Sequence, residues 1–473
     1  MPPRYSVRVL VRFLSPVLGL GLVLVVGCSS GEPSPASCRD CNVVLISIDT
    51  LRADHVAALG YPRATTPHFD ALAARGVLYE NAIAQSSWTR PAHMSMFTGL
   101  HPREHGFVSL GDTRPLEDTI PTIASVLRKQ GYRTAAFVGG VNLSASIGFD
   151  RGFDVFRSNG KYFRDNLEDS RYWLDHEAGE KFFLFLHGYD AHTPYANDRI
   201  DRAALGIADA PPQASHAGTC REEGSIERIA PFLDEYDAAV HRADRYLGKI
   251  VADLQARNLL RNTILLVVSD HGEEFLEHGR CFHISTLYRE VLHVPVLIVA
   301  PGLAPRRVAE LVAASVSIAP TVMELLGISP HPFPGPSLWN VAEGRPSAAK
   351  FVVSETERSM EKRGDGHLLA VTTADTKLIR WTTKDQQACF DLRTDLGEHN
   401  PLPTCQEPAD LTRELDTWTS THTAKTASRR RASPTAGQAA SPSPSPADAE
   451  PDEEALEDLE QLDEELRSLG YAQ

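Results

Sequence analysis

Two segments of the sequence place metal-binding residue types directly after runs of apolar residues that could form buried strands. Asp49 follows NVVLISI, and the pair Asp270-His271 follows NTILLVVS. Any one of these aspartates alone could be an ordinary capping residue. Together, two carboxylates and an imidazole form a mixed oxygen and nitrogen ligand set for a divalent cation; zinc is favoured, and manganese, magnesium or calcium also fit. The sequence predicts a metal centre if the fold brings these residues together.

A threonine opens a helix-like stretch, SSWTRPAHMSMFTG, at residues 86–99. Pro91 suits the first turn of a helix, and the backbone amides of that turn would face an anionic ester. A threonine hydroxyl is a poor nucleophile near neutral pH, but metal coordination lowers its pKa. Thr89 is therefore either a helix cap or the fourth ligand and the nucleophile. The second interpretation predicts attack on a phosphorus or sulfur centre.

Four further residues could complete such a site. HGYDAHTPY supplies Asp190 and His192, FLEHG supplies His278, and GRCFHISTLY supplies His283. His192 could contact the ester oxygens or protonate the leaving group, and turn packing is its structural alternative. His278 and His283 could bind a metal or the transferred group. Asp190 could join a second metal with His283, and the spacing does not decide between one metal and two.

These residues need a sheet edge to hold them. Apolar strand-like runs alternate with helical patterns, which implies a parallel sheet covered by helices on both faces, with ligands at the carboxyl ends of the strands. After about residue 350, KFVVSET, HLLAVTTAD and TKLIRWTT predict a small antiparallel subdomain. The expected strands span residues 42–49, 181–190, 262–270 and 294–300, and the expected helices span 119–130, 234–260 and 316–326.

The sequence resembles the sulfatase-like branch of the alkaline phosphatase superfamily over residues 42–400. NVVLISIDTLRADH, HTP, SDHGEEFLEHG, LHVPVLI, CFDLRTDLGEHN and the tail EELRSLGY carry the resemblance. It implies an α/β fold in which helices sandwich a parallel-rich central sheet, with a small C-terminal antiparallel subdomain. It also implies a metal-dependent ester hydrolase or transferase.

The sequence departs from true sulfatases at the nucleophile. Aligning Thr98-Gly99 with the end of the motif Cys/Ser-x-Pro-x-Arg puts Thr89 on the Cys/Ser and His93 on the Arg, so the resemblance implies that His93 holds the nucleophile or the ester oxygens. Threonine is not a substrate for conversion to formylglycine. Thr50 stands where many sulfatases carry a second metal aspartate, and His271 where they often carry asparagine.

These departures resemble nucleotide pyrophosphatase/phosphodiesterases and phosphoethanolamine or glycerolphosphate transferases. They imply phosphoryl chemistry on a small-molecule, lipid or glycan ester. The alternatives are a sulfuric ester hydrolase that works without formylglycine and a non-catalytic surface binding protein.

The N-terminus has the layout of an export signal. Arg4, Arg8 and Arg12 precede an apolar run at residues 13–26, which is short for a membrane span. The run ends in VVGC, which resembles the lipobox of bacterial lipoproteins and implies that Cys28 is lipidated. The protein is then exported and anchored by lipid to the bacterial cell envelope, at the outer membrane or cell surface.

The distribution of charge and the positions of the cysteines give further expectations about binding partners and disulfides. The formal charge of −15 is concentrated in residues 448–473, and no basic stripe predicts nucleic-acid binding. Cys38 and Cys41 lie on the tether, where a local disulfide is favoured over a redox or zinc motif. The predicted organisation is a signal peptide (1–27), a tether (28–41), a catalytic domain (42–345), a C-terminal subdomain (346–425), a Pro/Ser-rich disordered linker (426–451) and an acidic amphipathic helix (452–473).

Overall fold

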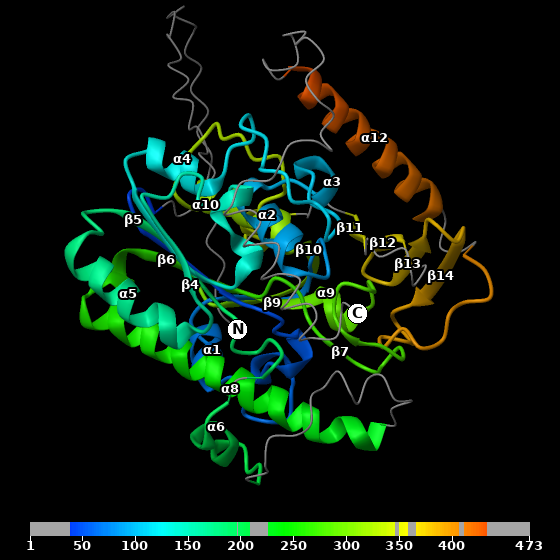
Figure 1. Ribbon diagram of the computed structural model, residues 1–473, viewed down its shortest axis with the longest axis horizontal. Helices are drawn as coiled ribbons and strands as arrows, with labels where there is room; N and C mark the ends of the chain where they lie inside the picture. Colours follow the sequence, from blue (N-terminus) through cyan, green and yellow to red (C-terminus); the bar gives the residue numbers. More distant parts are fainter. Residues whose placement is uncertain are drawn as a thin grey trace, which may run out of the picture. The chain divides into compact units, whose positions relative to one another are not determined.

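An eight-stranded sheet in the order β10-β2-β9-β6-β1-β5-β3-β4 lies at the centre of the described part of the computed structural model (Figure 1). Continuous apolar, β-branched runs such as NVVLISI form the middle strands, as the sequence predicted. The strands are β1 (Asn42–Ile48), β2 (Val77–Ile83), β3 (Arg133–Gly139), β4 (Val155–Gly160), β5 (Phe182–Gly188), β6 (Thr263–Val268), β9 (His293–Val299) and β10 (Arg306–Ala313).

The structure describes residues 38–195, 197–208, 226–345, 350–357, 366–405 and 411–432. The predicted signal peptide, Cys28, most of the tether, the linker beyond residue 432 and the acidic helix at 452–473 lie outside the described residues. The helices are α1 (Pro67–Ala73), α2 (Thr89–Thr98), α3 (Pro102–His105), α4 (Ile123–Lys129), α5 (Phe163–His176), α6 (Arg199–Ala204), α8 (Ile226–Ala256), α9 (Arg289–Leu292), α10 (Ile318–Leu325), α11 (Leu338–Ala342) and α12 (Leu411–Ala432).

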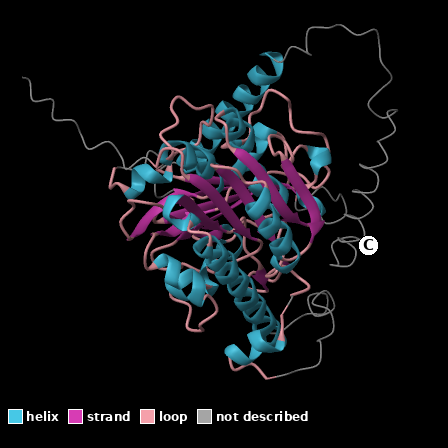
Figure 2. Cartoon of the chain, turned by 90° about the vertical axis from the view of Figure 1, so that its left-hand side faces the viewer, coloured by secondary structure: helices cyan, strands magenta, loops and turns pink. Residues whose placement is uncertain are grey.

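Alternate side chains of the central strands enter two hydrophobic cores. In β1, Val43 and Leu45 belong to the core shared with α2, α4 and α10, whereas Val44 and Ile46 belong to the core shared with α1, α5 and α8. Figure 1 labels these helices around the sheet, and Figure 2 shows helices on both sides of the strands. This period-two alternation buries both faces of the sheet, which is why the strands read as continuous apolar runs. The predicted α/β sandwich is confirmed.

One strand of the predicted parallel-rich sheet runs antiparallel to its neighbours. β9 runs antiparallel to both β2 and β6, whereas the other neighbouring strands pair in parallel. Residues 269–292, which join β6 to β9, contain only the short hairpin β7 (Glu274–Phe275) and β8 (Cys281–Phe282) and α9. A parallel connection needs a long crossover along a face of the sheet. Residues 269–292 form no such crossover, so β9 begins at the end of the sheet where β6 stops and runs antiparallel to it.

The predicted antiparallel subdomain is present, and its C-terminal boundary differs from the prediction. The strands β11 (Val352–Glu357), β12 (His367–Thr372), β13 (Thr376–Trp381) and β14 (Gln386–Asp391) pair in that order. Leu411, Leu415 and Trp418 of α12 pack on this sheet. α12 continues to Ala432, into the segment predicted as a linker. Apolar anchoring of its first turns explains how a polar sequence remains helical there.

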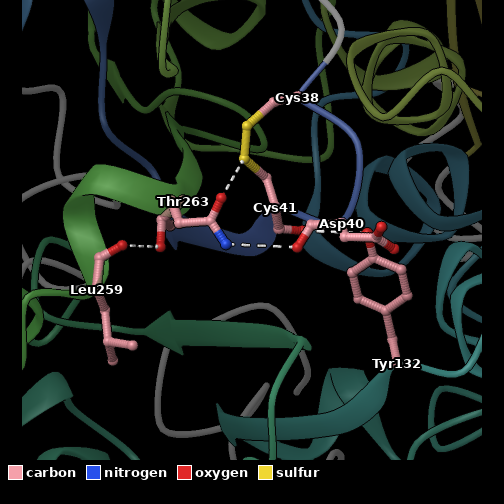
Figure 3. The surroundings of a disulfide bond; sticks show 7 residues. Cys38, Asp40, Cys41, Tyr132, Leu259 and Thr263 are labelled. Carbon is pink, nitrogen blue, oxygen red and sulfur yellow. Dashed lines mark hydrogen bonds between the residues drawn. A yellow bond between two sulfur atoms is a disulfide. The ribbon is translucent and has the colours of Figure 1, made fainter.

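One disulfide lies at the start of the described chain and another lies in the C-terminal subdomain. Cys38 and Cys41 are joined directly before β1, as predicted (Figure 3). The backbone N–H of Cys38 donates to the carbonyl of Leu325 in α10, 2.8 Å away. Cys389 of β14 is joined to Cys405. Within the described ranges, no helix is both long enough and apolar enough to span a bilayer.

Candidate active site

The carboxyl ends of three adjacent strands assemble the candidate site. β5, β1 and β6 are neighbours, and Ser47 of β1 is in register with His187 of β5 and Val268 of β6. Asp49 and Asp270 follow two of these strands by one or two residues and are fully buried. The sheet therefore brings together two carboxylates that are far apart in the sequence.

Thr89 lies beside the carboxylate of Asp49 and the imidazole of His271. It is the first residue of α2 and follows the N-cap residue Trp88, whose backbone is extended. Its Oγ1 lies 3.3 Å from Oδ2 of Asp49 and 3.3 Å from Nε2 of His271. The hydroxyl is thus directed at the candidate ligands and not at the helix backbone. The positive end of the α2 dipole lies at the same point.

The donor set fits a divalent cation. Ligand atoms of Asp49, Asp270 and His271 all lie within 4.8 Å of one another. Nδ1 of His271 donates to the carbonyl of Gly272 at 2.9 Å, which leaves a lone pair on Nε2 inside the cluster. Oδ2 of Asp270 is buried and accepts no hydrogen bond from the part of the chain that the structure describes. Burial, reinforced by the charge of Asp49, raises the pKa of Asp270 to about 8. A bound cation would supply the positive charge that these groups lack.

His93 forms a hydrogen bond with the backbone of Thr89. One helical turn after Thr89, its Nδ1 donates to the Thr89 carbonyl at 2.9 Å, and its Nε2 lies 2.9 Å from Oγ of Ser47. Nδ1 also lies 3.4 Å from Oδ2 of Asp270. His93 therefore contacts the backbone of Thr89 and the second carboxylate. Within the described residues, His93 forms no hydrogen bond with the Thr89 hydroxyl.

His192 and His283 lie beside the cluster. The His283 ring centroid is 4.5 Å from that of His271 and 5.1 Å from that of His192. Nδ1 of His192 donates to the Thr193 carbonyl at 2.5 Å, and Nδ1 of His283 lies 2.9 Å from Oε1 of Glu273. Burial lowers the pKa of His283 to about 3 and, reinforced by His283, lowers the pKa of His192 well below its usual value. Both rings are neutral in the metal-free protein.

Asp190 is engaged elsewhere. Its carboxylate accepts from the Arg242 guanidinium at 2.7 Å and from the backbone N–H of Phe163 at 2.8 Å. Burial raises the pKa of Asp190 to about 6, although Arg242 opposes the shift. The structure therefore places Asp190 in a buried ion pair, and the suggested second metal with His283 finds no support in these contacts.

His278 is also engaged elsewhere. Its Nδ1 lies 2.6 Å from Oε1 of Glu290, and its Nε2 lies 3.0 Å from the Glu398 carbonyl. Burial works against protonation, but the hydrogen bond and charge of Glu290 raise the pKa of His278. Because both partners are acceptors, His278 is an imidazolium that ties the segment after β6 to the loop after β14.

His187 is a site residue that the sequence did not predict. It lies inside β5, its Nε2 is 3.0 Å from Oδ2 of Asp49, and burial lowers its pKa to about 3. The available signal was a histidine near the end of an otherwise apolar strand, KFFLFLHGYD, immediately before residues already chosen as candidates.

The family model for sulfatases matches residues 41–328, more than half of the chain. The chain belongs to the sulfatase family. Members of this family depend on a divalent metal, in agreement with the carboxylate and imidazole cluster described above. The resemblance inferred from the sequence motifs is therefore confirmed.

Named relatives of this sulfatase-family protein are distant. Arylsulfatase K of Xenopus laevis is 24% identical over 341 residues, which cover 61% of this chain and 63% of the relative, so the chain spans less than two thirds of that relative's length. Delta 4,5-hexuronate-2-O-sulfatase of Bacteroides thetaiotaomicron is 23% identical over 433 residues, 81% of this chain and 87% of the relative. The phosphonate monoester hydrolase of Agrobacterium radiobacter shares the fold, with a TM-score of 0.65, 19% identity and coverage of 82% and 96%.

Proposed function

We propose that this sulfatase-family protein is a metal-dependent hydrolase or transferase of phosphate esters, with diesters favoured, and that Thr89 is its nucleophile. The observation that carries the proposal is the position of Thr89 Oγ1, 3.3 Å from both Asp49 Oδ2 and His271 Nε2. A nucleophilic hydroxyl needs a group that lowers its pKa, and this position beside the candidate metal ligands would provide one.

Asp49, Asp270 and His271 would hold the cation. When bound, it would lower the pKa of a hydroxyl that joins its ligands, which is the chemistry a threonine nucleophile needs. The α2 N-terminus would stabilise the anionic ester through its dipole and backbone amides. His93 would keep the backbone of Thr89 in place through the carbonyl hydrogen bond.

The reaction would proceed in two displacements. The Thr89 oxygen attacks phosphorus, the bond to the leaving alcohol breaks, and a phosphothreonine ester forms. Water or an acceptor alcohol then attacks phosphorus, and Thr89 is released. Nδ1–H of His192 is held by the Thr193 carbonyl, so Nε2 offers a lone pair that could accept a hydrogen bond from the incoming water or alcohol and orient it. Burial disfavours the imidazolium, which weighs against full proton transfer to His192 as well as against the donor role that the sequence suggested.

Sulfuric ester hydrolysis without formylglycine is the second candidate function. The family match and the names of the relatives, which are sulfatases, favour it. Such an enzyme would have to use the Thr89 hydroxyl in place of the formylglycine hydrate, because threonine is not a substrate for formylglycine formation. The third possibility is a surface binding protein without catalysis.

One set of assays separates the three functions. Purified protein from residue 36 onward is tested with an aryl phosphodiester, an aryl phosphomonoester and an aryl sulfate, with bound metal measured in parallel. We expect diester cleavage to exceed the other two, to fall about 10³-fold or more in Thr89→Val and to persist in Thr89→Ser. Valine is nearly isosteric and lacks only the hydroxyl, so full activity in Thr89→Val would refute the nucleophile. Faster sulfate turnover would favour the second function, and no metal with no turnover the third.

We further propose that Cys28 carries the lipid that anchors the exported protein to the cell envelope, where it would meet lipid or glycan esters. The supporting feature is the sequence VVGC after an apolar run. The full chain expressed in a Gram-negative host should partition into the detergent phase of Triton X-114, and Cys28→Ser should partition into the aqueous phase. Equal partitioning of both would refute the anchor.

A further inference from the structure

His187 contacts the side chain of Asp49 directly. It is the penultimate residue of β5, fully buried, and its Nε2 lies 3.0 Å from Oδ2 of Asp49. The backbone N–H of Asp49 donates to the carbonyl of Gly188, the last residue of β5, at 3.2 Å. Asp49 is thus tied to the end of β5 by both its backbone and its side chain.

A backbone amide fixes the tautomer of His187. The N–H of Gly139, the last residue of β3, donates to Nδ1 at 3.4 Å. An amide N–H can only donate, so Nδ1 carries the lone pair and a neutral ring carries its proton on Nε2. That proton points at the Asp49 carboxylate. A Cβ at Gly139 would lie 2.4 Å from the carbonyl oxygen of Lys161, so only glycine fits at the position that provides this amide.

We propose that His187 is a positioning residue that, through Nε2–H, orients the Asp49 carboxylate for metal binding. The inference rests on the proposed function in one respect, because it takes Asp49 as a metal ligand. Oδ2 of Asp49 accepts from His187 and from Thr89 Oγ1, and this holds Oδ1 at 3.9 Å from His271 Nε2. Fixing one oxygen therefore sets the direction of the other, and a ligand held in place before metal arrives binds it more tightly.

A packing role makes a different prediction. The His187 ring makes edge contacts with His93 and Tyr189, with centroids 4.8 Å apart in each case. If packing were the whole role, an apolar residue of similar volume would serve. If the hydrogen bond matters, glutamine would serve better, because its amide nitrogen can reach the position of Nε2, and asparagine would not, because its amide reaches only the position of Nδ1.

The test measures metal affinity and not turnover. Metal-free wild type, His187→Leu, His187→Asn and His187→Gln are titrated with Zn²⁺ and with Mn²⁺ against a chromophoric chelator. We expect Leu and Asn to weaken binding about 10–100-fold and Gln to stay within about threefold of wild type. The matched control is His293→Leu, because His293 of β9 also uses Nε2, with the Glu80 carbonyl 2.8 Å away, and is not part of the metal cluster. It should leave metal affinity unchanged.

The outcomes distinguish this inference from the proposed function. Wild-type affinity in His187→Leu, or equal losses in Gln, Asn and Leu, would overturn the positioning role while leaving the metal site intact. If the wild type binds no metal and Asp49→Ala changes nothing, both proposals fail together. Should His187→Leu not fold, the comparison of Gln with Asn still decides the inference, because both are polar and differ by one methylene.

Discussion

Replacing Asp270 with asparagine should make the metal-free protein more stable and the metal-loaded protein less stable. Asparagine keeps the shape of the side chain and removes its ability to ionise. In the metal-free protein, burial and the charge of Asp49 raise the pKa of Asp270 to about 8. The unfolded chain has an ordinary aspartate, with a pKa of about 4.

The size of the effect follows from these two values. Between about pH 4 and about pH 8, the unfolded state releases a proton that the native state retains, so the free energy of unfolding falls as the pH rises. At ~1.36 kcal/mol per unit of pKa shift, the loss reaches ~5 kcal/mol as an upper bound. Asp270→Asn removes this loss. Without metal we expect equal stability near pH 4 and an advantage for the variant near pH 8, on the order of 5 °C in Tm for a chain of this size.

Bound metal should make the wild type more stable than Asp270→Asn. The wild type gains RT ln(1 + [M]/Kd), about 7 kcal/mol at a hundred-thousandfold excess over Kd, which exceeds the ~5 kcal/mol loss, whereas the variant has lost a ligand and gains less. The assay is thermal unfolding of both proteins from pH 4 to pH 8, once with EDTA and once with saturating Zn²⁺. Identical pH dependence in EDTA would refute the reasoning, because Asp270 would then not be held protonated by burial beside Asp49. Equal stabilisation by Zn²⁺ would refute its role as a ligand.

Two further predictions concern residues away from the metal cluster. Arg242→Ala leaves the fully buried Asp190 carboxylate without its ion-pair partner. Urea unfolding should show that the free energy of unfolding falls by about 3–5 kcal/mol, and Arg242→Ala/Asp190→Asn should recover part of this loss. An unchanged unfolding midpoint in the single variant would contradict the buried pair. Trp418→Ala removes the ring that Arg103 covers at 4.9 Å and that His422 stacks on at 4.3 Å. Limited proteolysis should then cut α12 faster than in the wild type, while the metal affinity stays unchanged. Equal cleavage rates would contradict docking of α12 through Trp418.

The sequence predicts the part of the fold that apolar patterning controls. β1, β5 and β6 are continuous apolar runs, and residues directly after neighbouring parallel strands must meet at one edge. That rule alone brings Asp49 and Asp270 together. The direction of β9 does not follow from its pattern, because a buried strand reads the same in either orientation. It depends on the route of residues 269–292, which local sequence does not reveal.

The same rule fails where a distant partner decides the role of a residue. Asp190 also follows a buried strand, but Arg242 from α8 neutralises it across 52 positions of the sequence. His278 stands close to the ligands along the chain, yet Glu290 and the Glu398 carbonyl hold it in another network. His187 shows the reverse error. Inside a strand-like run it reads as a core residue, and only the register of β1 and β5 places it beside a carboxylate.

A cation bound by Asp49 and Asp270 would link two residues that are far apart along the chain. Asp49 and Asp270 belong to adjacent strands but are separated by more than two hundred residues, so a cation held between them closes a loop of that length. The entropy lost in closing a loop grows with its length, and an unfolded chain could not gather both carboxylates and His271 except at great cost. Ion uptake is therefore expected only after β1 and β6 have paired, so metal binding would report completed folding.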